Sequence, residues 1–149
     1  MALQIVNIAR AIADLDIPGL AIKDLDNIPA ECTNLLPVLF PEPVGYLSNF
    51  VVVWDSQGGH GVQMMTVQYD LRYTLLYSAI GAGRTGLEYY GQMMDKVSIL
   101  LDEMLVNDDL TGTIDFLPVE VTEAGPVPDP AGNMFLGCRL TLHVKEFVN

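Results

Sequence analysis

The chain has 149 residues, half of them hydrophobic, and 19 acidic residues against 7 lysines and arginines give a formal net charge of −12. This length suits one domain spanning residues 1–149, with a core of its own. So acidic a surface repels nucleic-acid phosphates, which argues against a sequence-reading DNA- or RNA-binding protein. The N-terminus lacks the basic region of a signal peptide, and no apolar run approaches the roughly 20 residues that cross a bilayer.

The first third of the chain combines one helix with a proline-punctuated segment. Apolar residues recur at helical spacing from about Leu3 to Leu15, and Pro18 and Gly19 end the pattern. A short strand is predicted from Leu20 to Leu25. Prolines then exclude a long helix, so one helical turn at 30–36 and extended chain over the surface are predicted. These prolines are Pro29, Pro37, Pro41 and Pro43.

The middle of the chain predicts a β-hairpin. A β-branched run, Phe50 to Trp54, leads into the glycine-rich stretch Asp55 to Gly61, which suits a hairpin loop. From Met65 to Tyr77 every second residue is apolar, and most of the residues between are polar. This alternation is typical of an antiparallel strand with one face packed and the other in water.

The C-terminal half predicts a long helix and a second hairpin. The helix runs from Gly86 to Val106, and two strands, Thr113 to Glu123 and Met134 to Val148, flank a long loop from Ala124 to Gly132. The apolar stripe of the helix is predicted to consist of Leu87, Tyr90, Met94, Val97, Leu101 and Met104. The fold class is therefore α+β, with an antiparallel or mixed sheet of about four to five strands packed by the long helix and the N-terminal helix.

Three glycines, Gly81, Gly83 and Gly86, have the G-x-G-x-x-G spacing of a dinucleotide-binding loop. That motif requires a short, wholly apolar parallel strand before the glycines and a second parallel strand, ending in an acid, after the helix. Here the preceding strand is two-faced, and the helix leads into a turn containing Asp108 and Asp109. The glycines are better interpreted as a sharp turn from strand to helix.

No arrangement typical of catalysis, cofactor binding or metal binding is found. His60 and His143 lie near no serine or cysteine pattern that would form a nucleophile, and they lack the spacing of a zinc site. Cys32 and Cys138 match no metal motif, and two buried thiols are favoured over a disulfide. The chain is therefore not predicted to be an enzyme, and no catalytic, cofactor-binding or metal-binding residue is assigned.

The order of the elements resembles that of the tail-terminator, or tail-completion, proteins of long-tailed bacteriophages. A helix leads, a proline-rich segment follows, then a strand pair, one long helix and a closing hairpin, over essentially the whole chain. Two stretches are similar in character: "LLPVLFPEP", Leu35 to Pro43, and "RLTLHVKEF", Arg139 to Phe147. Acidic composition and length agree with this resemblance.

The resemblance implies a structural neck protein of the virion, assembled in the host cytoplasm and associated with no membrane. It would form a ring, hexameric in this family, that caps the head-proximal end of the tail tube and joins it to the head connector. Its partners would be further copies of itself, the tail tube protein and the connector or stopper protein, while DNA passes through without specific binding. Two alternatives stay open: a head-completion or stopper protein of the same neck, and a small nucleotide-binding domain that uses the Gly81–Gly86 loop.

Candidate interface residues follow from the two hairpin loops and the tryptophan beside the first of them. Trp54 is a possible interface anchor, although a half-buried strand tryptophan explains it equally well. A channel that conducts DNA should be acidic, which suggests Asp108 and Asp109 as channel-facing residues. The interface candidates are Trp54, Gly58, Gly59, His60, Pro126, Pro128 and Asp129.

Overall fold

A long central strand, β4 (Met64–Ala79), organises the sheet because it pairs with three other strands. β6 (Met134–Val148) runs antiparallel along one side of it. On the other side, β3 (Leu47–Asp55) pairs with the first half of β4 and β2 (Val38–Pro41) pairs with the second half, both antiparallel. The antiparallel strand that the period-two pattern predicted is thus confirmed.

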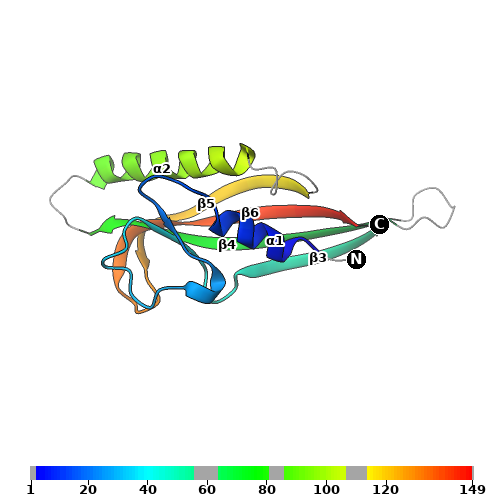
Figure 1. Ribbon diagram of the computed structural model, residues 1–149, viewed down its shortest axis with the longest axis horizontal. Coiled ribbons are helices and arrows are strands. Elements are labelled where there is room, and N and C mark those ends of the chain that lie inside the picture. The colour runs from blue at the N-terminus through cyan, green and yellow to red at the C-terminus, as the bar shows by residue number, and fades with distance from the viewer. Residues whose placement is uncertain (1–2, 56–63, 81–85, 107–113, 149) are drawn as a thin grey trace.

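Two further strands complete the sheet. β5 (Ile114–Pro128) pairs antiparallel with the outer side of β6, and β1 (Ala21–Ile22) pairs parallel with β2. The computed structural model describes residues 3–55, 64–80, 86–106 and 114–148. Over this part of the chain the mixed sheet has six strands, in the order β1-β2-β4-β6-β5 with β3 also beside β4 (Figure 1). The α+β class is confirmed, with slightly more strands than expected.

Two helices pack against one face of this sheet, α1 (Ile5–Ala13) and α2 (Gly86–Val106). The bounds of α2 are those predicted from the sequence. Each large apolar side chain buried between helices and sheet contributes about 1.5–3 kcal/mol, so this layer supplies most of the folding energy. The main core includes Ile8, Ile12, Met93, Val97 and Leu100 of the helices and Val67, Tyr69, Leu71, Leu75, Leu140, Leu142 and Val144 of the sheet.

A buried carboxylate ties α1 to the sheet. Glu146 of β6 accepts hydrogen bonds from the backbone N–H of Gln4, at 2.8 Å, and from the hydroxyl of Tyr69, at 2.6 Å. Gln4 stands at the start of α1, where backbone N–H groups have no partner within the helix and the helix dipole favours negative charge. Glu146 therefore satisfies one of these groups and fixes the start of the helix on the sheet.

The buried face of α2 differs from the predicted stripe. Leu87, Tyr90 and Met94 were expected in the core, but all three are exposed. The helix is rotated so that its buried residues are Met93, Val97, Leu100 and Met104. The reason is that α2 is apolar over a wider arc than the sheet covers, so periodicity alone could not select which part of the arc is buried.

The proline-punctuated segment was predicted to run extended over the surface, and this prediction is wrong. Strand β2 is buried at every position, and it lies inside the sheet. On the sheet face opposite the helices, a second core cluster covers one end; it consists of Cys32, Val38, Phe40, Leu76, Val127 and Phe135. The face predicted to be wet is therefore covered at that end by the segment before β2, and only the rest of it is polar and accessible.

The closing hairpin also differs from its prediction. Strand β5 continues through Ala124 to Pro128, so only a short connection joins it to β6. The prediction of a long loop over 124–132 is therefore wrong. The strand tolerates its prolines because β5 is an edge strand, where a missing N–H removes no required hydrogen bond.

Candidate functional site

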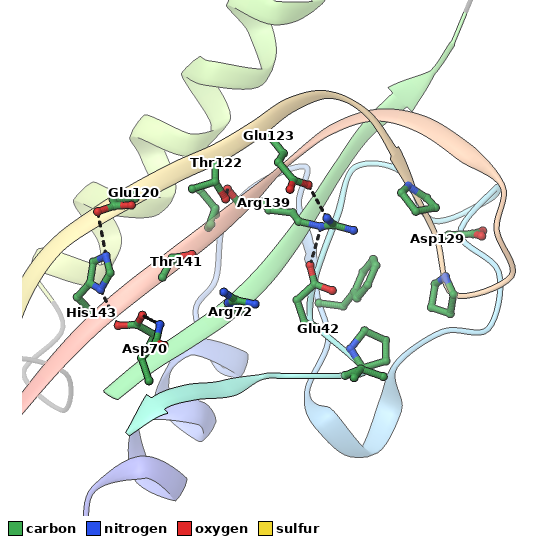
Figure 2. Close-up of a pocket in the computed structure, with 17 residues that line it drawn as sticks. Glu42, Asp70, Arg72, Glu120, Thr122, Glu123, Asp129, Arg139, Thr141 and His143 are labelled. Atoms are coloured by element: carbon green, nitrogen blue, oxygen red, sulfur yellow. Dashed lines mark hydrogen bonds and ion pairs between the residues drawn. The ribbon is translucent and has the colours of Figure 1, made fainter. Parts of the chain in front are cut away.

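A groove lies on the polar face of the sheet, opposite the helices, with a volume of about 790 Å³ (Figure 2). The strand register creates it: Asp70 of β4 lies directly opposite His143 of β6, and Arg72 lies opposite Thr141. Because successive side chains alternate between the faces of a strand, these positions share one surface. Glu120 of β5, opposite Thr141 on the other side, completes the polar row.

His143 is held between two carboxylates. Its Nδ1 lies 2.6 Å from Oδ1 of Asp70, and its Nε2 lies 3.2 Å from Oε1 of Glu120, a contact that lacks hydrogen-bond geometry. Asn49, with a φ of 53° that asparagine tolerates better than most residues, donates from Nδ2 to the other oxygen of Asp70 at 2.7 Å. The imidazole is therefore fixed by strands β4 and β5 and by the chain at the bulge of β3.

The pKa of His143 is raised by this arrangement. Partial burial alone would lower the pKa, but the hydrogen bond and charge of Asp70, together with the nearby negative charge of Glu120, outweigh the burial. The folded state thus favours the protonated imidazolium more than the unfolded chain does, and in that form His143 bridges carboxylates of β4 and β5.

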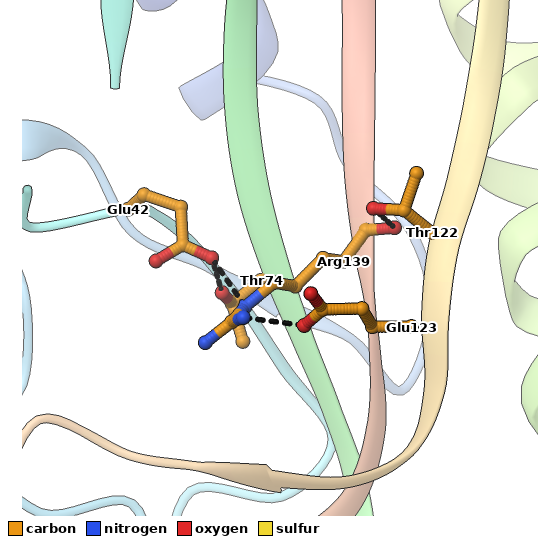
Figure 3. Close-up of polar contacts among 5 residues, drawn as sticks. All are labelled: Glu42, Thr74, Thr122, Glu123 and Arg139. Carbon is orange, nitrogen blue, oxygen red and sulfur yellow. Dashed lines mark hydrogen bonds and ion pairs between the residues drawn. The ribbon is translucent and has the colours of Figure 1, made fainter. Parts of the chain in front are cut away.

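A second ionic cluster is centred on Arg139 (Figure 3). Its Nε lies 3.1 Å from Oε1 of Glu42, and its Nη1 pairs with Glu123 of β5. Glu42 follows β2 and also accepts a hydrogen bond from the hydroxyl of Thr74. Thr122 donates to the carbonyl oxygen of Arg139 at 3.4 Å. The guanidinium therefore links the chain after β2 to β5 across the width of the sheet.

The chemistry that this groove can perform is limited because His143 and Arg139 are paired with carboxylates. Both ring nitrogens of His143 face carboxylates, so neither is directed at a hydroxyl or thiol that it could activate. In the described residues, no group of three or more histidine, cysteine or carboxylate side chains could hold a metal ion. The ion pairs consequently act as clamps between strands, and the groove offers a polar docking surface in which acids outnumber bases.

The predicted interface residues within the described segments do not form one patch. Trp54 lies opposite Met65, near the beginning of β4, whereas Pro126 lies opposite Leu136, near the beginning of the antiparallel β6. Because β4 and β6 run in opposite directions, these positions lie at opposite ends of the sheet. Trp54, Pro126 and Pro128 are all exposed, and Pro128 lines the end of the groove.

Asp129, one of the predicted interface residues, is buried in the structure. Its Oδ1 accepts from the backbone N–H of Asn133 at 2.9 Å, and its Oδ2 accepts from the backbone N–H of Cys32 at 3.1 Å. Burial alone would raise its pKa, but these hydrogen bonds outweigh it and lower the pKa. Asp129 thus joins the closing hairpin to the segment before β2, which is a structural role.

The remaining candidates lie outside the described residues. This applies to Gly58, Gly59 and His60 of the first hairpin loop, and to Asp108 and Asp109, which stay predictions. Gly81 and Gly83 also lie outside, but the strand before them is described.

That strand, β4, is antiparallel to each strand it pairs with, and β6 separates it from β5. The buried parallel strand pair that a dinucleotide-binding loop requires is therefore not the setting of these glycines.

Two surfaces escaped the sequence analysis. The groove depends on which strands pair with β4. The alternation at 65–77 assigned side chains to the two faces of that strand, but it did not show which strands lie beside it. The second is β3, whose side chains from Phe50 to Trp54 are all exposed. The run of β-branched residues was a signal for a strand, but an apolar run by itself is equally typical of a buried one.

No protein-family model matches the chain, and no curated protein is significantly similar to it in sequence. In the segments that the structure describes, no helix is both long and apolar enough to cross a membrane.

Proposed function

We propose that the chain is a structural subunit of the neck of a long-tailed bacteriophage, a tail terminator. In this proposal, copies of the chain form a hexameric ring on the head-proximal end of the tail tube. The ring stops further addition of tube subunits and provides the surface to which the head connector binds. The protein would be part of the virion after assembly in the host cytoplasm.

The observation that carries the proposal is the exposed apolar strand β3 in an otherwise acidic chain. Long, uncharged edge strands are avoided on proteins that act as monomers, because they pair with other chains. A subunit of a ring or tube needs such a surface, whereas an enzyme working alone does not. The chain with a net charge of −12 nevertheless keeps residues 44–54 free of charge.

Two further features support a structural role. The element order on which the resemblance depends, with a leading helix, a proline-rich segment, a hairpin, a long helix and a closing hairpin, is also the order of the fold. In the groove, His143 is paired with Asp70 and Glu120, and Arg139 is paired with Glu42 and Glu123, which suits strand clamping better than catalysis. In the ring, acidic residues such as Asp108 and Asp109 would face the channel and let DNA pass without binding.

Electron microscopy of tail tubes provides the direct test. Tubes assembled from the tube protein of the same genome are incubated with the purified chain and imaged. We expect a ring at one end of each tube and an arrest of tube elongation, measured as a fixed length distribution. Tubes that keep growing and carry no end-bound density would contradict the proposal.

Position in the particle separates the two neck proteins. A terminator binds the tube directly, whereas a stopper binds the connector and leaves tube elongation unchanged. Calorimetric titration with NAD, FAD and ATP addresses the nucleotide-binding alternative, and we expect no heat of binding. Saturable binding that is lost on Gly83→Trp would instead favour that alternative.

A further inference from the structure

Strand β3 extends the helix-side face of the sheet beyond the helices. Val52 lies opposite Val67 and Trp54 opposite Met65 on β4, so these side chains stand on the same face as the main core. Phe50 stacks on Tyr69 of that core, with ring centroids 6.0 Å apart. Yet Trp54 is 66% exposed, and Phe50 and Val52 are also exposed. The apolar face of the sheet is thus wider than the layer of helices that covers it.

Helix α2 shows the complementary feature, an apolar face wider than the sheet that it covers. Leu87, Tyr90 and Met94 recur at spacings of three and four residues and form one exposed flank of the helix. Leu87, at 84% exposed, is almost wholly in solvent. On the opposite flank, Lys96 donates a hydrogen bond to the carbonyl oxygen of Pro18, which fixes the rotation of the helix. One chain therefore has an apolar flank of α2 that no strand covers and an apolar face of β3 that no helix covers.

These two surfaces lie on opposite sides of the molecule. The Tyr90 hydroxyl approaches Gly125 of β5, so the apolar flank of α2 is directed toward the β5 edge of the sheet. β3 pairs with β4 on the side away from β6 and β5. Figure 1 shows β3 along one long side of the molecule and α2 along the other. A contact between them must therefore join two copies of the chain.

We infer that the apolar flank of α2 of one copy packs on the helix-side face of β3 of the next copy. The contact is heterologous, since each copy contributes α2 to one neighbour and β3 to the other. Rotation about an axis repeats such a contact, and a rotation that closes produces a ring. This inference depends on the proposed function for the biological role of the ring, but the contact itself follows from the two surfaces.

The size and charge of the surfaces suit a second copy as the occupant. On the helix-side face of β3, the three apolar side chains Phe50, Val52 and Trp54 are 45%, 39% and 66% exposed and together present roughly 300 Å², enough for the apolar centre of an interface. An interface of standard size buries about 800 Å² on each partner, with an apolar centre and a polar rim. Neither apolar surface contains a charged side chain, so two chains of net charge −12 can meet there without placing carboxylates against each other.

Substitutions on each surface test the inference by mass. We expect the unmodified chain to assemble at high concentration, while Val52→Asp and Met94→Asp each yield a monomer of 16.3 kDa. An equimolar mixture of the two variants retains one intact α2 flank and one intact β3 face. It should form a heterodimer of twice the monomer mass and nothing larger, as measured by light scattering after size-exclusion chromatography.

Matched controls lie on the same two elements. Val53 is 46% exposed, against 39% for Val52, but stands on the opposite face of β3. Ile99 is 43% exposed, against 40% for Met94, and lies on the other flank of α2. We expect Val53→Asp and Ile99→Asp to assemble like the unmodified chain. Circular dichroism melting of all four variants verifies that each is folded.

The single tryptophan of the chain gives a second readout. Because Trp54 becomes buried in the contact, its emission should shift to shorter wavelength as the unmodified chain is concentrated, and this shift should be absent in Met94→Asp. An unmodified chain that stays monomeric, or a Met94→Asp chain that assembles normally, overturns the inference. Ring formation on tail tubes by both Asp variants would overturn the contact while leaving the proposed neck function intact.

Discussion

Strands β3 and β5 lie at opposite edges of one sheet, and within the described residues each pairs with a single strand. β5 contains three prolines, which remove N–H groups, and two register shifts. It also carries two exposed acids, Glu120 and Glu123. β3 has no charge and no proline from Leu47 to Trp54, and it has one register shift.

The β5 edge of the sheet is thus protected against pairing with other chains, whereas the β3 edge is open to a partner. Prolines, bulges and charges are the usual means by which a sheet edge avoids pairing with other chains. The β5 edge is also tied internally by Arg139 and His143, whereas β3 contributes little to the core. We therefore expect substitutions near β5 to change folding stability and substitutions on the helix-side face of β3 to change assembly.

The largest expected effect is at Gly137, where β6 passes between β4 and β5. A Cβ atom at this position would lie 2.3 Å from the backbone oxygen of Leu75, which cannot move away as a side chain could. Gly137→Ala should lower the free energy of unfolding by about 3 kcal/mol, measured by urea denaturation. Gly91 of α2 has open space around it, so Gly91→Ala should instead raise stability by about 0.5–1 kcal/mol. Equal effects of the two changes would contradict this account.

Arg139 provides the direct comparison between the edges. Arg139→Met keeps the apolar stem but leaves the partly buried Glu42 without its ion pair, so the free energy of unfolding should fall by about 1–3 kcal/mol. Val53→Thr on β3 should change it by less than about 0.5 kcal/mol. Urea denaturation of both variants measures the difference. A β3 substitution as costly as Arg139→Met would show that the edges are equally important for folding.

Asp129 links the β5–β6 hairpin to the segment before β2. Asp129→Ala removes the acceptor of the Cys32 and Asn133 N–H groups and should cost about 1–2 kcal/mol of stability. Asp129→Asn keeps one acceptor oxygen and should cost less. Hydrogen exchange of the Cys32 amide, followed by NMR, should become faster in both variants. An unchanged exchange rate would mean that the hydrogen bond does not restrain this segment.

The smallest expected effect concerns pH and His143. Its pKa is raised in the folded state, so its contribution to stability is present in full below the ordinary value of 6.5 and is lost as the pH rises through the folded-state pKa. The contribution should be about 1 kcal/mol or less, as for other partly exposed ion pairs. Denaturation midpoints across this pH range measure it, and His143→Gln should remove this part of the pH dependence. An identical pH profile in both proteins would exclude the role of His143.

Local sequence patterns predicted the helices and strands better than they predicted the polar groove. The alternation at 65–77 identified β4, and the bounds of α2 were predicted correctly. The groove could not be predicted, because Asp70, Arg139 and His143 come together only through the β4–β6 register. Trp54 was identified as a possible anchor, and it is exposed. Its neighbours on β3 are exposed as well, but they were not identified as interface residues, because a β-branched run does not show whether the strand is covered.

What the sequence by itself determined was the helix and strand content, the two-faced character of β4 and the acidity of the surface, because each depends on residues close together in the chain. The tertiary structure alone decided that β6 lies between β4 and β5, that the proline-rich segment includes a buried strand and that Asp129 is an internal acceptor. It also decided which part of the apolar arc of α2 faces the sheet. These outcomes depend on contacts between residues far apart in sequence, where burial of the whole molecule outweighs local preference.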